Sequence, residues 1–396
     1  MESKVDEASD RRAQHSKPMN HSQLPSSSIQ DSSFNRVLIL PPELITEILL
    51  RLPVKSLLKF RCVSKSWLSL ISSPEFVNTH LSTCVNNTEY THHRLMLGLD
   101  KGLKVYSVRS LLYEDESVEA THLDFPTKGY FSIVGSVNGL ICLRTGPNNM
   151  LLWNPSMRKL KNCTAFIAAP KGVFYLWGFG YDEVHDDYKV VRMFYAINGG
   201  NSCDVKVEIY SLKSDSWKGI DGFQYGKIHS CLGKLVNGKL HWITSGAHPG
   251  SNDGDIIFID LADEKWGVLE QPCHGENEFY FNLGVLGSYL SVFRTYQSTW
   301  ADVWVMKEYG VKESWAKIYT IKFDEDIPKH GRSPLFCKSN KGEILLALGS
   351  RFMIYNPKAN SLRYPKISKS YFSFSDGICV ESLVCPFLQN EPRMQQ

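Results

Sequence analysis

The stretches EIYSLKSDSW (208–217), IFIDLADEKW (257–266) and WVMKEYGVKESW (304–315) each end in a tryptophan, and these tryptophans lie 49 residues apart. Two similar stretches, LLWNPSMRKL (151–160) and MIYNPKANSL (353–362), carry an Asn-Pro pair at the corresponding point. Each stretch has the pattern of a strand, a polar turn and a second strand, so a β-hairpin recurs along the chain.

The period of this repeat predicts the architecture. The aromatic or apolar residue before each turn serves as an anchor, and the steps between anchors are 47, 57, 49, 47 and 49 residues; the anchors are Tyr106, Trp153, Tyr210, Ile259, Met306 and Tyr355. A unit of ~50 residues with four short strands has the size of a propeller blade. Residues 94–388 hold six such units. We therefore predict a six-bladed β-propeller, closed by one or two strands from residues 370–386.

Residues 40–81 have a helical period instead. Leu44, Ile48 and Leu52 are spaced by four, which predicts a first helix from Pro42 to Arg51 that ends before Pro53. A second helix follows around Leu57, and Ser64 is the expected N-cap of a third that ends at 72–74. Three helices in about 40 residues bury too little surface to be stable alone, which indicates a module that docks on a partner.

The predicted fold class is therefore α+β multidomain, with a small three-helix domain before an all-β domain. Residues 1–33 contain nine serines and few apolar residues, which is typical of a disordered tail. The expected boundaries are a polar tail at 1–36, the helical domain at 37–82, a linker at 83–93, the β-domain at 94–388 and a polar tail at 389–396.

Composition excludes several classes of function. A formal net charge of +3, spread along the chain, predicts no binding to nucleic acid or to an anionic membrane. Ten scattered cysteines without any C-x-x-C motif argue against a disulfide framework or a structural zinc site, and favour thiols in a reducing compartment. No apolar leader and no long apolar window appear, so we expect the cytoplasm, the nucleus or both.

The segment 40–81 resembles the F-box, the module by which one class of ubiquitin-ligase subunit docks on a Skp-type adaptor. The resemblance is carried by Leu40-Pro41, Leu44, Ile48-Leu49, Leu52-Pro53, Leu57, Cys62-Val63-Ser64-Lys65 and Trp67. The remainder resembles the F-box-associated region of plant F-box proteins, through LLWNP (151–155), FGYDEVHDDYKVVR (179–192), VNGKLHW (236–242) and VESLV (380–384). Such proteins are often called kelch-type, although the Gly-Gly doublet of kelch blades occurs only at 199–200.

The resemblance implies a substrate-recognition subunit of an SCF-type cullin-RING ubiquitin ligase, without catalysis or a cofactor of its own. The partners would be a Skp-type adaptor, through it the cullin and RING subunits, and a protein target. The residues it assigns to adaptor docking are Leu40, Pro41, Leu44, Ile45, Ile48, Leu49, Leu52, Pro53, Val54, Leu57, Val63 and Trp67. No target-binding residue is assigned. Basic residues outnumber acidic ones in this segment, which would favour an acidic partner surface or simply form a solvated helix face; the basic residues are Arg51, Lys55, Lys59, Arg61 and Lys65, and the acidic ones Glu43, Glu47 and Glu75.

Three alternatives stay open. The same apolar residues could simply form the core of the helices, and the β-domain could be a propeller enzyme of the glycosidase or oxidase type, or a scaffold outside any ligase. No G-x-S-x-G, P-loop or H-E-x-x-H motif is present. The repeated tryptophans are interpreted as blade-packing residues, and the acidic stretch at 182–187 as a turn. His92 and His93 lack a third metal ligand at usable spacing. Target contacts are expected in longer loops, at 114–130, 196–204, 245–254, 271–280 and 323–334.

Overall fold

The computed structural model describes residues 40–99, 102–114, 116–123, 131–146, 149–163, 173–196, 205–228, 230–244, 254–272, 280–296, 299–323, 335–348, 351–367 and 375–387. Its helices are α1 (Pro42–Leu50), α2 (Val54–Phe60), α3 (Lys65–Ser72), α4 (Pro74–Val85), α5 (Val108–Tyr113) and the 3₁₀ turn η1 (Lys312–Ser314).

The helical region contains four helices, where the sequence predicted three. Ser64 caps α3 as expected, because its Oγ accepts a hydrogen bond from Trp67 N at 3.1 Å. The expected stop at 72–74 is instead a junction: Ser73 Oγ accepts from Phe76 N at 3.2 Å and caps α4. Pro74 occupies the first helical position, where its missing N–H costs nothing. The helix α4 then runs to Val85, into the stretch expected to be linker.

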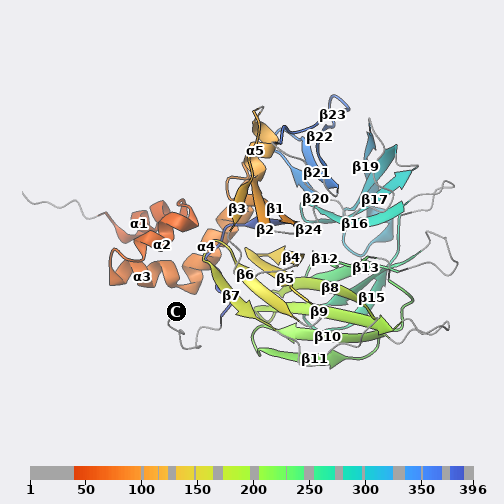
Figure 1. Cartoon of the computed structure of the whole chain (residues 1–396), viewed down its shortest axis with the longest axis horizontal. Coiled ribbons are helices and arrows are strands. Elements are labelled where there is room, and N and C mark those ends of the chain that lie inside the picture. Colours follow the sequence, from red (N-terminus) through yellow and green to blue (C-terminus); the bar gives the residue numbers. More distant parts are fainter. Residues whose placement is uncertain are drawn as a thin grey trace, which may run out of the picture. The chain divides into compact units, whose positions relative to one another are not determined.

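Six antiparallel four-stranded sheets form the β-domain, which confirms the six-bladed propeller (Figure 1). In chain order the strands are β1 (His93–Leu99), β2 (Gly102–Ser107), β3 (Thr121–Leu123); β4 (Ser132–Val137), β5 (Leu140–Arg144), β6 (Met150–Asn154), β7 (Lys159–Asn162); β8 (Val173–Asp182), β9 (Asp187–Ala196), β10 (Val205–Ser211), β11 (Ser216–Ile220); β12 (Lys234–Val236), β13 (Lys239–Ile243), β14 (Ile256–Asp260), β15 (Trp266–Leu269); β16 (Tyr280–Leu286), β17 (Tyr289–Tyr296), β18 (Trp300–Met306), β19 (Trp315–Lys322); β20 (Leu335–Lys338), β21 (Ile344–Leu348), β22 (Arg351–Asn356), β23 (Ser361–Arg363); and β24 (Ser375–Val380).

The anchors of the sequence repeat occupy equivalent positions, because each lies at or next to the last residue of the third strand of its blade. Tyr106 is in β2, Tyr210 in β10 and Tyr355 in β22. The long step of 57 residues contains β8 and β9, which have ten residues each. The longer turn before Trp315 holds η1.

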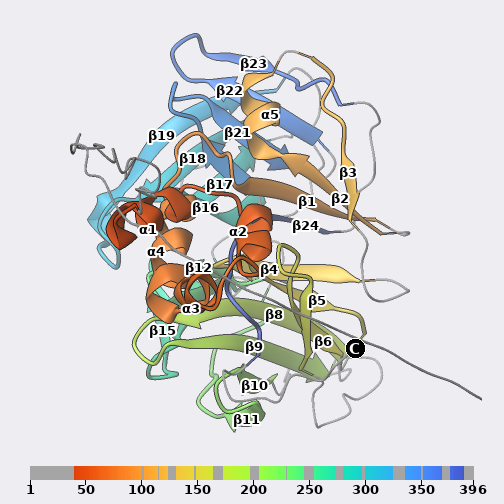
Figure 2. The same cartoon turned by 90° about the vertical axis from the view of Figure 1, so that its left-hand side faces the viewer.

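The ring closes through one C-terminal strand. β24 pairs with β1, with Val380 opposite His93, and gives the sheet order β24-β1-β2-β3. The short helix α5, which the sequence did not predict, connects β2 to β3 and lies beside β1 and β21 in both views (Figure 2). The first blade is thus assembled from the two ends of the β-domain.

The core of the β-domain is divided among the seams between blades. Six clusters of buried apolar side chains each join two neighbouring blades. Leu176 and Trp242, for example, belong to the cluster between the third and fourth blades. Each blade is therefore stabilised mainly by burying both of its faces against its neighbours.

The connections between strands divide between two faces, which we name the linker face and the distal face. On the linker face, β1 begins at His93, and Tyr90 Oη of the linker donates to Lys338 O, at the end of β20, at 2.5 Å. The turn between β4 and β5 is there too, because a Cβ on Gly139 would touch Ser382, just beyond β24. Strands that pair antiparallel alternate in direction, so successive connections alternate between the linker face and the distal face.

Candidate functional site

The helix α1 presents apolar side chains to solvent. Leu44 and Ile48 are one helical turn apart and each is 50% exposed, and Leu40 before the helix is 47% exposed. Large apolar side chains left exposed on one helix are a feature of docking helices. The stripe inferred from the sequence is therefore partly available to a partner.

Other residues of the docking set lie in the core of the helices. Leu49, Val54 and Leu57 are at most 1% exposed. Of the remaining members, Val63 is 60% exposed, Pro41 and Pro53 are exposed, and Ile45, Leu52 and Trp67 are half-buried. Leu49, Val54 and Leu57 would support docking by shaping the helices, whereas Leu40, Leu44, Ile48 and Val63 offer apolar surface.

The half-buried Trp67 joins two helices. Its ring meets that of Phe60 edge to face, with 5.5 Å between centroids. Arg61 Nη2 donates to Ile71 O at 3.4 Å, a second tie between α2 and α3.

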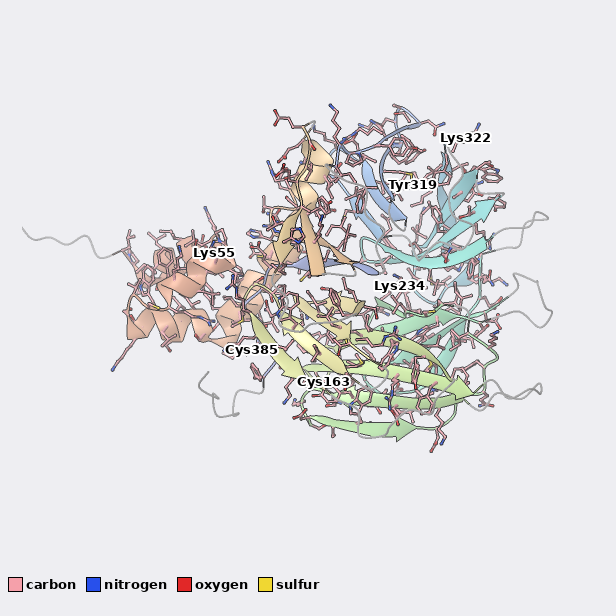
Figure 3. All side chains as sticks on the ribbon, in the orientation of Figure 1. Lys55, Cys163, Lys234, Tyr319, Lys322 and Cys385 are labelled. Carbon is pink, nitrogen blue, oxygen red and sulfur yellow. The ribbon has the colours of Figure 1, made fainter. Side chains whose placement is uncertain are left out.

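Basic side chains on the helices are exposed, as their proposed role in attracting an acidic partner requires. Lys55 (labelled in Figure 3), Lys59 and Lys65 are exposed, Arg61 is half-buried, and Arg51, just after the end of α1, pairs with Glu47 of α1 at 3.3 Å. Such a surface pair contributes little to stability.

The sequence interpretation missed α4 and with it a buried histidine. His80 lies in α4 and its Nε2 is 2.9 Å from Leu52 O. The signal was present, because Ser-Pro-Glu at 73–75 is a typical helix start.

The repeated tryptophans pack between blades. Trp217 Nε1 donates to Cys163 O at 3.2 Å (Cys163 is labelled in Figure 3), and Trp315 Nε1 donates to Glu270 O at 2.9 Å. In both cases the acceptor directly follows the last strand of the preceding blade. Trp266 instead packs on Phe223, with 5.1 Å between centroids. The structure thus agrees with the interpretation as blade-packing residues.

The acidic stretch after β8 forms a turn, as expected. Asp182 accepts hydrogen bonds from Val184 N at 3.0 Å and from the His185 ring at 2.8 Å, and Lys189 Nζ is 3.0 Å away. Burial alone would raise the pKa of Asp182, but the hydrogen bonds from Lys189 and His185 lower it. Lys189 also donates to Leu261 O at 2.5 Å, so this turn ties the third blade to the fourth.

The structure also bears on metals and membranes. No group of three or more His, Cys, Asp or Glu side chains suited to a metal ion occurs within the described ranges. None of the helices in that part of the chain has the length and apolar character needed to cross a bilayer.

Most residues of the five loops proposed for target contact lie outside the described residues. Their flanking strands are described, and four of the loops connect strand ends at the distal face; these are 196–204, 245–254, 271–280 and 323–334. The stretch 114–130 contains β3, so its two parts lead to different faces.

Comparisons with known proteins agree with the fold and the helical module. The profile of the F-box associated beta propeller domain matches residues 95–379, and that of the F-box domain matches residues 37–79. The F-box protein CPR1 of Arabidopsis thaliana is 31% identical over 379 residues, which cover 87% of this chain and 88% of the relative. The Arabidopsis thaliana F-box/kelch-repeat protein At3g23880 is also 31% identical, over 88% of this chain and 96% of its own length. The chain is therefore a member of the plant F-box proteins with a C-terminal F-box-associated β-propeller domain.

Proposed function

We propose that this protein is the substrate-recognition subunit of an SCF-type cullin-RING ubiquitin ligase. The helices would dock on a Skp-type adaptor, which would bring the cullin and RING subunits, and the propeller would bind a protein target. The chain would carry out no bond chemistry itself, and it would act in the cytoplasm, the nucleus or both. The F-box match over residues 37–79 supports the adaptor as partner.

The exposure of Leu44 and Ile48 is the observation that carries this proposal. In a partner groove, the two half-exposed aliphatic side chains on one turn of α1 would bury apolar surface that is otherwise in contact with water. The neighbouring Leu49 is 1% exposed, so it supports the helix from inside. The exposed lysines at 55, 59 and 65 would raise the rate of association with an acidic adaptor surface.

The target would approach the distal face. The linker leaves from the opposite face, where Tyr90 is bonded to Lys338 O. The strand ends that lead into four of the longer connections all lie at the distal face. Long connections on a rigid scaffold are suited to recognition. Binding at the distal face would also leave the helices free for the adaptor.

Co-purification tests the adaptor role. The full chain and a tagged Skp-type adaptor would be co-expressed as wild type, as a Leu44→Asp, Ile48→Asp double variant, and as a Val184→Asp control. Val184 is 76% exposed in the propeller turn after β8. Its replacement by Asp therefore makes the same kind of change, an exposed aliphatic side chain to a carboxylate, at a site outside α1. We expect stoichiometric recovery of wild type and control, and loss of the double variant.

Two results would contradict the proposal. If the wild-type protein is folded but is not recovered with the adaptor, the remaining alternatives for its function are a scaffold outside any ligase and a propeller enzyme. Undiminished recovery of the double variant would remove α1 from the docking surface. The circular dichroism of all three proteins should be the same, because the changed positions are exposed.

A further inference from the structure

A buried histidine beyond the F-box match holds the backbone between α1 and α2. His80 is 1% exposed, and its Nε2 lies 2.9 Å from the carbonyl oxygen of Leu52. A carbonyl oxygen only accepts, so Nε2 carries the proton and donates it. Leu52 and Pro53 belong to the residues that the F-box resemblance assigns to docking, whereas His80 does not.

The Leu52 carbonyl fixes the tautomer of this histidine, and the thiol of Cys84 lies beside the ring. With the proton on Nε2, Nδ1 of a neutral ring is an acceptor; Cys84 Sγ, one turn along α4, lies 3.7 Å from Nδ1 and 3.9 Å from Nε2. Burial raises the pKa of Cys84 to about 12, so its thiol stays protonated at neutral pH. Burial also lowers the pKa of His80, which favours the neutral ring.

The ring is held by packing as well. Phe76, one turn before His80 on α4, stacks on it with 6.2 Å between centroids and an interplanar angle of 15°. The ring of His92 lies 6.5 Å away, at an interplanar angle of 65°. The direction of the Nε2–H bond is therefore set before any partner arrives.

None of the described backbone hydrogen bonds around this turn uses the Leu52 carbonyl oxygen. Leu52 N donates to Leu49 O at 3.0 Å and Ser56 N donates to Pro53 O at 2.9 Å, but Pro53 has no N–H to donate. The Leu52 carbonyl oxygen instead accepts a hydrogen bond from His80 of α4. Through it, α4 fixes the direction in which α1 ends and α2 begins.

We propose that His80 is a positioning residue for adaptor docking, which holds the Leu52–Pro53 turn in the form that the adaptor binds. This inference rests on the proposed function, because it assumes that an adaptor binds these helices. His80 would not touch the adaptor. Because His80 would already hold the turn in the free protein, the turn would lose less conformational entropy when the adaptor binds.

The test compares two substitutions of His80. His80→Gln keeps an N–H near the position of Nε2, and His80→Met fills a similar volume without a donor. Asn78→Ala, at an exposed site on α4, is the control. The affinity of each purified full chain for a Skp-type adaptor would be measured by calorimetry, and amide hydrogen exchange of the free chains would be followed by mass spectrometry.

We expect His80→Met to weaken binding roughly tenfold, His80→Gln to bind within about threefold of wild type, and Asn78→Ala to bind as wild type. Exchange at Arg51 and Leu52 should accelerate in His80→Met alone, with the propeller strands unchanged. Equal binding by wild type and His80→Met overturns the inference, as does equal loss in the Met and Gln variants, which would show that only the ring packing matters. Failure of wild type to bind overturns the proposed function instead, and the exchange data then decide on the turn alone.

Discussion

Asn154 and Ser382 lie 228 residues apart in the chain and are joined by hydrogen bonds in a buried site. Asn154 Nδ2 donates to Ser382 O at 3.0 Å and to Val384 O at 2.7 Å. Asn154 Oδ1 accepts from the backbone of Ser156 and Met157 and so also forms the turn after β6. One fully buried amide thus joins the second blade to the segment that closes the ring.

Replacing the Asn154 side chain should destabilise the closure of the ring. Asn154→Asp removes the donor and places a carboxylate against two carbonyl oxygens, so we expect a loss of roughly 3 kcal/mol or more in the free energy of unfolding, measured in urea. Asn356→Asp is the matched control, because Asn356 Oδ1 forms the same kind of turn with Lys358 N and Ala359 N. Similar losses in the two variants would show that the turn, rather than the closure, accounts for the effect.

The seam between the third and fourth blades depends on a glycine. Gly233 N donates to Trp177 O at 2.7 Å, and a Cβ on Gly233 would lie 2.6 Å from the Trp242 ring. Trp242 is fully buried, so Gly233→Ala should overpack the seam and cost about 1–3 kcal/mol of stability. Gly219→Ala, where nothing lies within 4 Å, should be neutral. A Gly233→Ala protein that melts at the wild-type temperature would contradict this account of the seam.

Acid should destabilise the β-domain through His241. Its Nδ1 donates to Lys234 O at 3.0 Å and its Nε2 accepts from Tyr309 Oη at 2.7 Å, which satisfies the neutral ring. Burial lowers the pKa of His241 to about 4, and the charge of Lys239 acts in the same direction. Between pH 6.5 and about 4 the unfolded state therefore binds the extra proton, and stability falls as the pH falls, by up to roughly 3 kcal/mol.

The pH profile of His241→Leu checks this assignment. The variant should be less stable than wild type at pH 7.5, where Tyr309 loses its acceptor, but its stability should depend less on pH between 6.5 and 4. His122→Leu, at an exposed site, should keep the full dependence. A His241→Leu profile parallel to that of wild type would assign the acid sensitivity to other groups, such as His93, whose pKa burial also lowers to about 4.

The cysteines should differ sharply in reactivity. Cys62, Cys231 and Cys385 are exposed, whereas burial raises the pKa of Cys337 and Cys379 to about 12. Thiolates are the reactive form, so among the described cysteines brief treatment with iodoacetamide at neutral pH should modify Cys62, Cys231 and Cys385 first. Mass spectrometry of the digested protein gives the order of labelling. Early modification of Cys337 would indicate that the blade containing it opens in the native state.

The repeat was visible in the sequence because equivalent residues make similar contacts in several blades. Trp217 and Trp315 each donate to the end of the preceding blade, so their period follows the blade period. The helical stripe was visible too, but not which of its residues face solvent. Leu44 and Leu49 look alike in the sequence, and only packing makes one half-exposed and the other buried.

Two kinds of feature could not be predicted. The closing strand was predicted within residues 370–386, but the hydrogen bond from Asn154 to Ser382 was not, because no local pattern marks contacts between residues so far apart. The helix α5 has only six residues, too few to show a period. The helix α4 was missed for a different reason, because Pro74 was interpreted as an end although the proline occupies the first turn.

The late position of β24 has a consequence for synthesis. The helices α1 to α4 leave the ribosome some 290 residues before β24 does, which at 5–20 residues per second is roughly 15–60 s earlier. The docking helices would thus be complete while the first blade still lacks its closing strand. A transcript with a stop codon before residue 375 would yield chains that occupy the adaptor without a closed propeller, and such chains should act as dominant inhibitors of the intact protein.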